Sequence, residues 1–420
     1  MEFKYSLNDR PKFSHLLLYG IQWLLISIPV VLTSTFIAPE GATIAYTQKL
    51  FGLMGAVMVV QALFGHRLPL VAGPATALMM GILSATAQGC SQSAIYTALM
   101  IGGIFIALVA ISGVMSRLQR LFTPRIVISI LLLIAFTITK PIINLIFSNP
   151  AHQQLAFWFC IICTTLMAVA NNLLRGVWKS TVVMWAMIIG SVVYYAFVGF
   201  PDSIAADTRP STLFMQHFEF DWGVIISMIV CYVALLINQV GSVQSLGNMV
   251  GADSMPTRNK RGMILVGAGN ILSGALGIVG PVDYSLSPGI VASTQCASRY
   301  TVIPAGLAMV AIAFSPSIVG FLMSIPATVM GTVLLFLMGT MLAAGFEMIR
   351  NTGSVTEFRH GMIIGLPILF DVIMTFAPSS AIASIPEVIR PIIGNGFVMG
   401  VLIILLLEHV FLRDKKPLKQ

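Results

Sequence analysis

The sequence predicts an all-α protein that crosses a membrane many times. Hydrophobic residues make up 57% of the 420 positions, and charged residues make up only 9%. Apolar runs of about 20 residues, the length that a helix needs to cross the hydrocarbon layer, recur from His15 to Leu412. An outer-membrane barrel would instead show alternating segments of roughly ten residues, so we set that class aside.

Reading the apolar runs in order gives fourteen transmembrane spans. They cover about 15–36, 46–64, 69–86, 95–115, 122–147, 153–174, 178–199, 222–250, 262–280, 284–297, 301–322, 325–347, 361–378 and 390–412. Basic residues precede the first span without a convincing cleavage site, so we expect this span to be retained. The expected fold therefore has seven spans in each half.

The basic residues support this number of spans. With the N-terminus inside, 19 of the 23 Lys and Arg residues fall on the cytoplasmic side, as the positive-inside rule expects. One span more or fewer would invert the later loops and destroy the agreement. The four exceptions are Lys49, Lys140, Arg209 and Arg390. We therefore expect an inner-membrane protein with both termini in the cytoplasm. We expect no nucleic-acid partner, since the basic residues are spread over short loops.

Two Gly/Pro patches interrupt the apolar runs at matching places in the two halves. The first is AGPATA (72–77) in the third span, and the second is YSLSPG (284–289) in the tenth. Matched interruptions of this kind mark the ligand site in many transporters. We expect each span to run as a short extended segment followed by a half-helix, because freed backbone groups must face protein, water or ligand. The half-helix N-termini would then offer N–H donors near the midplane.

Seven spans per half is an odd number, so the second half must enter the membrane from the opposite side. The repeat is therefore inverted. Pro124, near the start of the fifth span, and Pro326, at the start of the twelfth, form a second matched pair. Gly and Pro are common in membrane helices, but this accounts less readily for two pairs in corresponding positions.

The eighth span carries the most polar intramembrane face, which includes Asn238, Gln239 and Ser242, and Gln22 is similarly placed in the first span. A side-chain amide is both donor and acceptor, which suits a planar ligand with N–H and C=O edges. Hydrogen bonding between helices is the competing explanation. For the Asn238–Gln239 pair we favour contact with a ligand.

Over almost its whole length the chain resembles the nucleobase-ascorbate transporters, as a divergent member. The segments that carry the resemblance, in order, are FGHRLP (64–69), GPATA (73–77), NQVGS (238–242), GAGN (267–270), GIVASTQCASRY (289–300), SIP (324–326) and GNG (394–396). Each motif alone is weak. Their order and spacing make the resemblance fairly specific.

The resemblance implies a core domain made of residues 1–120 and 222–323 and a gate domain made of residues 121–221 and 324–420. It also implies a homodimer, alternating access by movement of the core against the gate, and a substrate between the third and tenth spans. The substrates implied are xanthine, urate, hypoxanthine or a similar purine-type base, or uracil, commonly carried with a proton.

This chain departs from the family pattern where the family carries acids. The eighth-span glutamate that grips the base is Asn238 here, and the tenth-span motif Glu-Asn-Ile-Gly becomes LSPG (286–289), with Leu286 at the acidic position. An amide does not titrate, so the usual proton coupling is in question. Asp283, just before the second break, and Asp371, in the thirteenth span, are the remaining candidates, since acids inside a membrane are commonly functional.

The expected function is secondary active transport of a nucleobase, with H+ or Na+ as the coupling ion. The expected substrate-binding residues are Gln22, Ala75, Thr76, Asn238, Gln239, Ser242, Ser287, Pro288 and Gly289. A transporter of small anions with the same architecture and a ligand sensor that does not transport remain as alternatives. The six histidines are dispersed, so we expect no enzyme activity, no metal and no cofactor.

Overall fold

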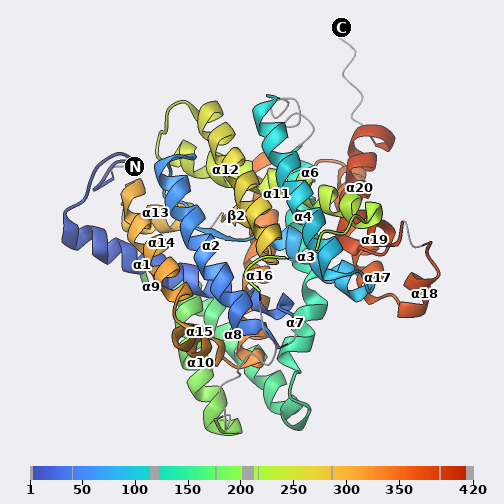
Figure 1. Cartoon of the computed structure of the whole chain (residues 1–420), viewed down its shortest axis with the longest axis horizontal. Helices are drawn as coiled ribbons and strands as arrows, with labels where there is room; N and C mark the ends of the chain where they lie inside the picture. The colour runs from blue at the N-terminus through green and yellow to red at the C-terminus, as the bar shows by residue number, and fades with distance from the viewer. Residues whose placement is uncertain are drawn as a thin grey trace.

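The computed structural model describes residues 3–39, 41–113, 123–175, 177–200, 212–215, 217–284, 287–386 and 389–412. Most of these residues are helical (Figure 1). Arg209, Leu286 and the C-terminal residues 413–420 were part of the sequence-based reasoning and lie outside the described ranges.

One group of helices combines the first and third quarters of the chain. It contains α1 (Phe13–Leu32), η1 (Thr35–Ile37), α2 (Thr43–Leu63), α3 (Thr76–Ala87), α4 (Gln92–Ile111), α11 (Trp222–Met249), α12 (Met255–Leu276), α13 (Ser287–Thr294), η4 (Arg299–Thr301), α14 (Val302–Ala313) and α15 (Pro316–Met323). Figure 1 shows α14 beside α2 and α12 beside α4, and these are the two most extensive helix contacts.

A second group combines the other two quarters. It contains α6 (Pro124–Thr137), α7 (Thr139–Ile146), η3 (Pro150–His152), α8 (Gln153–Leu173), α9 (Val177–Ser180), α10 (Val182–Val198), α16 (Ala327–Thr352), α17 (Phe358–Phe376), α18 (Ser379–Ala383), α19 (Arg390–Ile393), α20 (Gly396–Leu406) and the π-helical turn η5 (Leu407–Phe411). Within it α16 packs on α6, α7 and α8, and α17 packs on α6 and α20.

Side-chain caps define several helix starts. Thr123, Asp221 and Asn395 each accept a hydrogen bond from the backbone N–H three residues further on, at the beginning of α6, α11 and α20. Such a cap satisfies a backbone donor that the first turn of a helix leaves unpaired. Pro124 directly follows its cap, at the position where proline costs a helix nothing.

Small residues let α4 and α12 approach closely. A Cβ added to Gly267 would lie 2.9 Å from the carbonyl oxygen of Gly103, and a Cβ on Gly103 would lie 2.8 Å from that of Gly267. Both glycines therefore bring the two backbones into direct contact, as is common between membrane helices.

Eight helices of the described chain are long and apolar enough to cross a membrane, and a ninth span is formed if the pair Arg299–Ala313 and Pro316–Met323, bent by 97°, is counted as one. Three shorter apolar helices cover Thr76–Ala87, Val182–Val198 and Gly396–Phe411. The chain is thus a multi-pass helical membrane protein, and the number fourteen stays a prediction.

Two short strands cross near the middle of the first helix group. Strand β1 (Ala72–Pro74) pairs antiparallel with β2 (Pro281–Asp283), and Gly73 lies opposite Val282. Each strand is followed by a short helix, α3 or α13. All six strand residues are buried.

Candidate functional site

The two strands form the backbone of the candidate site. Beyond the paired residues, the Ala75 N–H donates to the Gly280 carbonyl at 2.8 Å, and the Tyr284 N–H donates to the Val71 carbonyl at 2.8 Å. The Tyr284 hydroxyl donates to the Pro74 carbonyl at 2.7 Å. Non-helical backbone at this depth is thereby satisfied within the protein, as a low-dielectric surrounding requires.

Gly73 is needed for this crossing. A Cβ at this position would lie 2.5 Å from Val30 Cγ1 and 2.7 Å from Tyr284 Cε2. Real Cβ atoms do not approach other atoms so closely, so a larger residue would push β1 away from α1 or displace the tyrosine ring.

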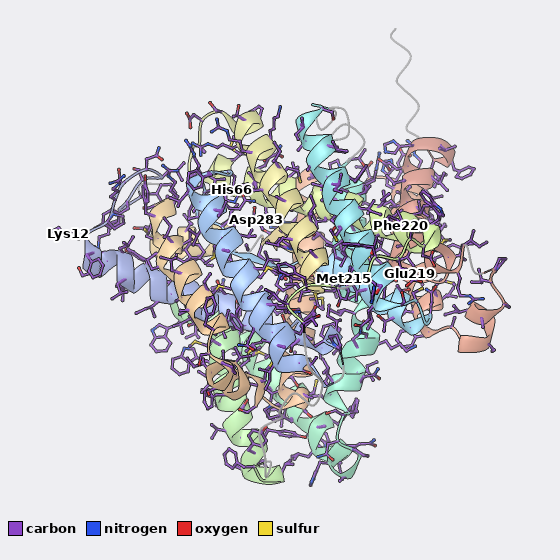
Figure 2. All side chains as sticks on the ribbon, in the orientation of Figure 1. Lys12, His66, Met215, Glu219, Phe220 and Asp283 are labelled. Carbon is purple, nitrogen blue, oxygen red and sulfur yellow. The ribbon has the colours of Figure 1, made fainter. Side chains whose placement is uncertain are left out.

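A buried polar cluster lies at the end of β2. Asp283 Oδ2 lies 3.1 Å from His66 Nε2 and also accepts a hydrogen bond from Gln239 Nε2. The Asp283 N–H donates to Gln239 Oε1 at 2.8 Å, so the amide of Gln239 holds both the side chain and the backbone of Asp283. Figure 2 shows His66 and Asp283 next to each other in the interior. The exposed fraction of each of the three residues is at most 1%.

The protonation pattern of His66 follows from its other contact. The Leu68 N–H donates to His66 Nδ1 at 3.0 Å, so Nδ1 is the acceptor and Nε2 carries the hydrogen. Nε2 then faces Asp283 Oδ2 at ion-pair distance, although its N–H points too far off this line for a hydrogen bond. Asp283 Oδ1 has no hydrogen-bond partner among the described residues. A carboxylate with one unpaired oxygen beside an imidazole is chemically suited to take up and release a proton.

The predicted residues of α1 and α11 are brought to different surroundings. Gln22 is buried, and its Nε2 has no hydrogen-bond partner in the described chain. Gln239 and Ser242 are buried, whereas Asn238 is half-buried. Gln239 is bonded to Asp283 through both ends of its side-chain amide, which leaves Gln22 Nε2 as the unpaired amide group among these described residues.

The predicted residues at the two breaks surround the strand crossing. Ser287, at the start of α13, donates to the Tyr284 carbonyl at 3.1 Å and accepts from the Val71 N–H at 3.0 Å. Pro288 is buried beside it, and Gly289 continues α13. Ala75 is buried, and the half-buried Thr76 begins α3.

Asp371 lies in the second helix group, on α17. Its Oδ1 accepts hydrogen bonds from Thr137 at 2.9 Å and from Thr375 at 3.4 Å, and its Oδ2 has no partner among the described residues. The residue is fully buried. The structure therefore does not join the two candidate acids, since Asp283 contacts His66 and Gln239 instead.

His66 and Tyr284 are the site residues that reasoning from sequence did not select. His66 belongs to a segment that carried the family resemblance and Tyr284 begins the second Gly/Pro patch, but neither stood out as a ligand or proton site. The available signal was a histidine in the loop that leads into the first Gly/Pro patch. Histidines in loops are frequent, so only the contact with Asp283 distinguishes this one.

Two cavities lie between the two helix groups. The larger, of about 590 Å³, has walls from α3 on one side and from α6, α7, α17 and the segment from α18 to α20 on the other. The smaller, of about 250 Å³, is lined by α1 and α13 on one side and by α8, α9, α10 and α16 on the other. None of the predicted site residues lines either of these two cavities. Among the described residues, no group of three or more His, Cys, Asp or Glu side chains is placed to hold a metal ion.

Sequence comparison shows similarity along nearly the whole chain. Residues 14–380 match the family model Xan_ur_permease, described as "Permease family". The putative purine permease CPE0397 of Clostridium perfringens is 24% identical over 97% of this chain and 92% of its own length. The nucleobase transporter PlUacP of Paenibacillus larvae is 24% identical over 84% of this chain and 82% of its own.

Comparison with solved structures shows a common fold. The transmembrane domain of the cyanobacterial bicarbonate transporter BicA superposes with a TM-score of 0.66 at 11% identity, covering 88% of this chain and 98% of that domain. The murine anion transporter Slc26a9 in its inward-facing state gives a TM-score of 0.58 at 11% identity, covering 94% of this chain and 69% of its own.

Proposed function

Since this chain belongs to the Permease family that the match over residues 14–380 identifies, we propose that it is a secondary active transporter for a nucleobase, of purine type or uracil. The resemblance to nucleobase-ascorbate transporters inferred from the sequence is confirmed by this match. Relatives described as purine permeases, a nucleobase transporter and a uric acid permease support the substrate class. The relatives are permeases, which fits a protein that carries its ligand rather than transforming it.

The proposed architecture has fourteen spans in two inverted halves. The long helices, the bent pair and the three shorter apolar helices, taken with α12 and α13, supply fourteen segments in the described chain. The first helix group corresponds to the proposed core, residues 1–120 and 222–323, and the second to the proposed gate, residues 121–221 and 324–420. Contacts within each group support this division. The chain would lie in an inner membrane, with both termini cytoplasmic.

The proposed substrate site is the strand crossing and the half-helices that leave it. The observation that carries this proposal is the antiparallel pairing of β1 with β2, which joins the two segments that lead into α3 and α13. Their first residues, Thr76 and Ser287, and the amides of Gln22 and Asn238 would contact the base. Gln239 would act through Asp283, because both its side-chain groups are bonded to that residue.

For the coupling ion we propose a proton held by Asp283 beside His66. The family glutamates are replaced by Asn238 and Leu286 here, while Asp283 supplies a buried carboxylate at the strand crossing. Asp371 is the second candidate, at the border of α17 with α6 and α20. Asp283→Asn should allow exchange of labelled base across a vesicle membrane but abolish accumulation driven by a proton gradient. Proton-driven accumulation by this variant would show that Asp283 does not carry the proton. The carrier would then be Asp371 or neither of the two acids.

A transporter of small anions is the second candidate function. The similarity of the fold to the bicarbonate transporter BicA favours it, although such a likeness at 11% identity shows the fold alone. A thermal-shift screen of the purified protein separates the two functions, because a ligand that binds only the folded state raises the midpoint of unfolding. Stabilisation by purines or uracil supports the first function, and stabilisation by bicarbonate or sulfate alone would replace it with the second.

Uptake into proteoliposomes tests both transport and the site. Asn238→Ala should abolish uptake of labelled xanthine or urate without lowering the amount of folded protein. Gln244→Ala is the matched control, because Gln244 lies on the same helix and is exposed. Normal uptake by Asn238→Ala would remove this residue from the site, and binding without any uptake by the unchanged protein would identify a sensor.

The homodimer stays a proposal as well. Helices α8, α9 and α10 of the second group expose large apolar side chains, among them Trp158, Leu166, Trp178, Ile189 and Phe197. Lipid or a second copy would cover such a face. Cross-linking across the gate domains of the protein in native membranes distinguishes the two.

A further inference from the structure

The larger cavity carries an unusual concentration of basic groups. Lys140, on α7, and Arg390, on α19, both line it. These are two of the four basic residues that violate the positive-inside pattern, and both would lie near the outer face in the proposed topology. None of the described residues that line this cavity is acidic.

The two basic groups are held toward the cavity by the main chain. Lys140 Nζ donates to the Thr375 carbonyl at 3.2 Å, and Arg390 donates through Nε and Nη2 to the Ile385 carbonyl at 3.1 and 2.9 Å. These partners are neutral carbonyls, and within the described part of the chain neither basic group forms an ion pair. A cleft with walls of low polarity strengthens the field of such charges.

A buried amide adds a fixed donor. Asn395 lines the cavity with an exposed fraction of 1%, and its Oδ1 accepts from the Val398 N–H at 3.2 Å. This cap orients the amide so that Nδ2 is the free end, and Nδ2 has no hydrogen-bond partner among the described residues. A buried donor without a partner is unfavourable, and an acceptor on a ligand would remove this cost.

An acceptor stands on the opposite wall. Gln88, near the end of α3, donates through Nε2 to Ser84 Oγ at 2.9 Å, which leaves its Oε1 as the free end. The cavity therefore offers two positive charges, one N–H donor and one carbonyl acceptor to a ligand. A volume of about 590 Å³ is within the range of sites for small organic ligands.

The carboxylates nearest the cavity among the described residues lie outside its lining. Asp371 lies behind Thr137 and Thr375, and Glu219, labelled in Figure 2, accepts a hydrogen bond from Ser91. Burial raises the pKa of the Cys90 thiol, and the charges of Asp221, Arg390 and Glu219 also act on it, so Arg390 shares this surrounding with two acids. Of the two basic residues, we therefore take Lys140 as the main source of positive charge inside the cavity.

The smaller cavity has the same chemical character. Its polar lining residues include Lys179 and Asn171, and no described lining residue is acidic. Both cavities at the border between the two helix groups are thus lined by a basic side chain and a side-chain amide.

From this arrangement we propose that the larger cavity is an entry site that selects the ionised form of an oxopurine, a planar monoanion with ring carbonyl and N–H groups, over a neutral base. The proposal rests on the proposed function, since it names the charge of the transported base. Lys140 and Arg390 attract the anion, Asn395 donates to a ring carbonyl, and Gln88 accepts from a ring N–H.

The experiment compares urate, which is an anion at neutral pH, with hypoxanthine, which is neutral. Each purine is added as an inhibitor of uptake into proteoliposomes, and the concentration that halves uptake is measured. The proteins compared are the unchanged protein, Lys140→Gln, Lys140→Arg and Lys49→Gln. Lys49 also lies off the cytoplasmic side, but it contacts the Thr212 and Leu276 carbonyls and does not line the cavity. Lys140→Gln should lower the preference for urate over hypoxanthine about tenfold, as expected for one lost charge. Lys140→Arg and Lys49→Gln should keep the preference.

An unchanged preference in Lys140→Gln would overturn the proposal while leaving nucleobase transport intact. If that variant does not fold, the unchanged protein provides the second measurement. Added salt should weaken the binding of urate more than the binding of hypoxanthine. Equal weakening of both would also overturn it. Failure of the proposed function has a different signature, in which neither purine is transported or stabilises the protein.

Discussion

His66 Nε2 lies 3.1 Å from Asp283 Oδ2, and the two side chains are almost completely buried. This contact joins the loop after α2 to the end of β2, so it links the two halves of the chain at the strand crossing. A carboxylate in such surroundings carries a desolvation cost, which the neighbouring imidazole and the amide of Gln239 offset.

Removal of either partner should destabilise the protein. We expect His66→Ala and Asp283→Ala each to lower the free energy of unfolding by about 1–3 kcal/mol, because each leaves a buried polar group with one contact fewer. The double variant should lose clearly less than the sum of the two, as measured by reversible denaturation in mixed micelles.

Asp253 provides the control for this experiment. It is exposed, and its pairing with Arg258 at 2.7 Å lowers its pKa through a hydrogen bond and through charge. Asp253→Ala should therefore change stability little, because water replaces the partner. Additive losses in the His66 and Asp283 cycle would show that the two side chains do not interact in the membrane protein.

Close packing of α4 on α12 should be sensitive to single methyl groups. Gly267→Ala places a Cβ 2.9 Å from the Gly103 carbonyl oxygen and should cost about 1–3 kcal/mol by forcing the helices apart. Gly241→Ala is the matched control, since no atom lies within 4 Å of the added Cβ. Thermal unfolding in detergent measures both, and equal midpoints would contradict the close contact.

The ion pair between Arg125 and Glu408 should stabilise the second helix group. Arg125 Nε donates to both oxygens of Glu408 at 3.0 Å, and the Glu408 side chain is 3% exposed. Glu408→Gln should lower the unfolding midpoint by several degrees, since Arg125 then keeps its charge without a counter-charge.

An exposed pair on α16 controls for general loss of charge. Arg350 and Glu347 are 3.8 Å apart with most of both side chains in contact with solvent. Glu347→Gln should leave the midpoint close to that of the unchanged protein. A drop as large as that of Glu408→Gln would indicate that burial does not set the contribution of these pairs.

The hydroxyl of Tyr232 should contribute a measurable part of the stability of the first helix group. It is placed between the Leu99 carbonyl, at 2.8 Å, and Asn270 Oδ1, at 3.0 Å. The Asn270 amide in turn donates to the Pro281 carbonyl at 3.0 Å, at the start of β2. Tyr232→Phe should cost about 1–2 kcal/mol by leaving these acceptors with fewer donors. Unchanged stability would mean that water or other donors reach them.

Local sequence patterns predicted the class of protein, but they predicted the contacts of the candidate site less well. Runs of apolar residues long enough for the bilayer predict membrane helices, because each helix satisfies its own backbone and needs no distant partner. The Gly/Pro patch at 72–77 contains β1, whereas β2 ends at Asp283, directly before the second patch, and α13 begins inside that patch at Ser287. The sequence predicted that Gln239 contacts a ligand. In the structure its amide binds Asp283, a contact that no helical spacing predicts.

The sequence by itself determined that this is a multi-pass helical membrane protein of a permease family, since hydropathy, charge distribution and ordered motifs are properties of the chain alone. Only the tertiary structure decided that His66 meets Asp283 and that Lys140 shares a cavity with Arg390 and Asn395. These residues come from segments far apart in the sequence. Their proximity arises from the packing of α2, α7 and the C-terminal helices, and their charges become significant because packing removes water from around them.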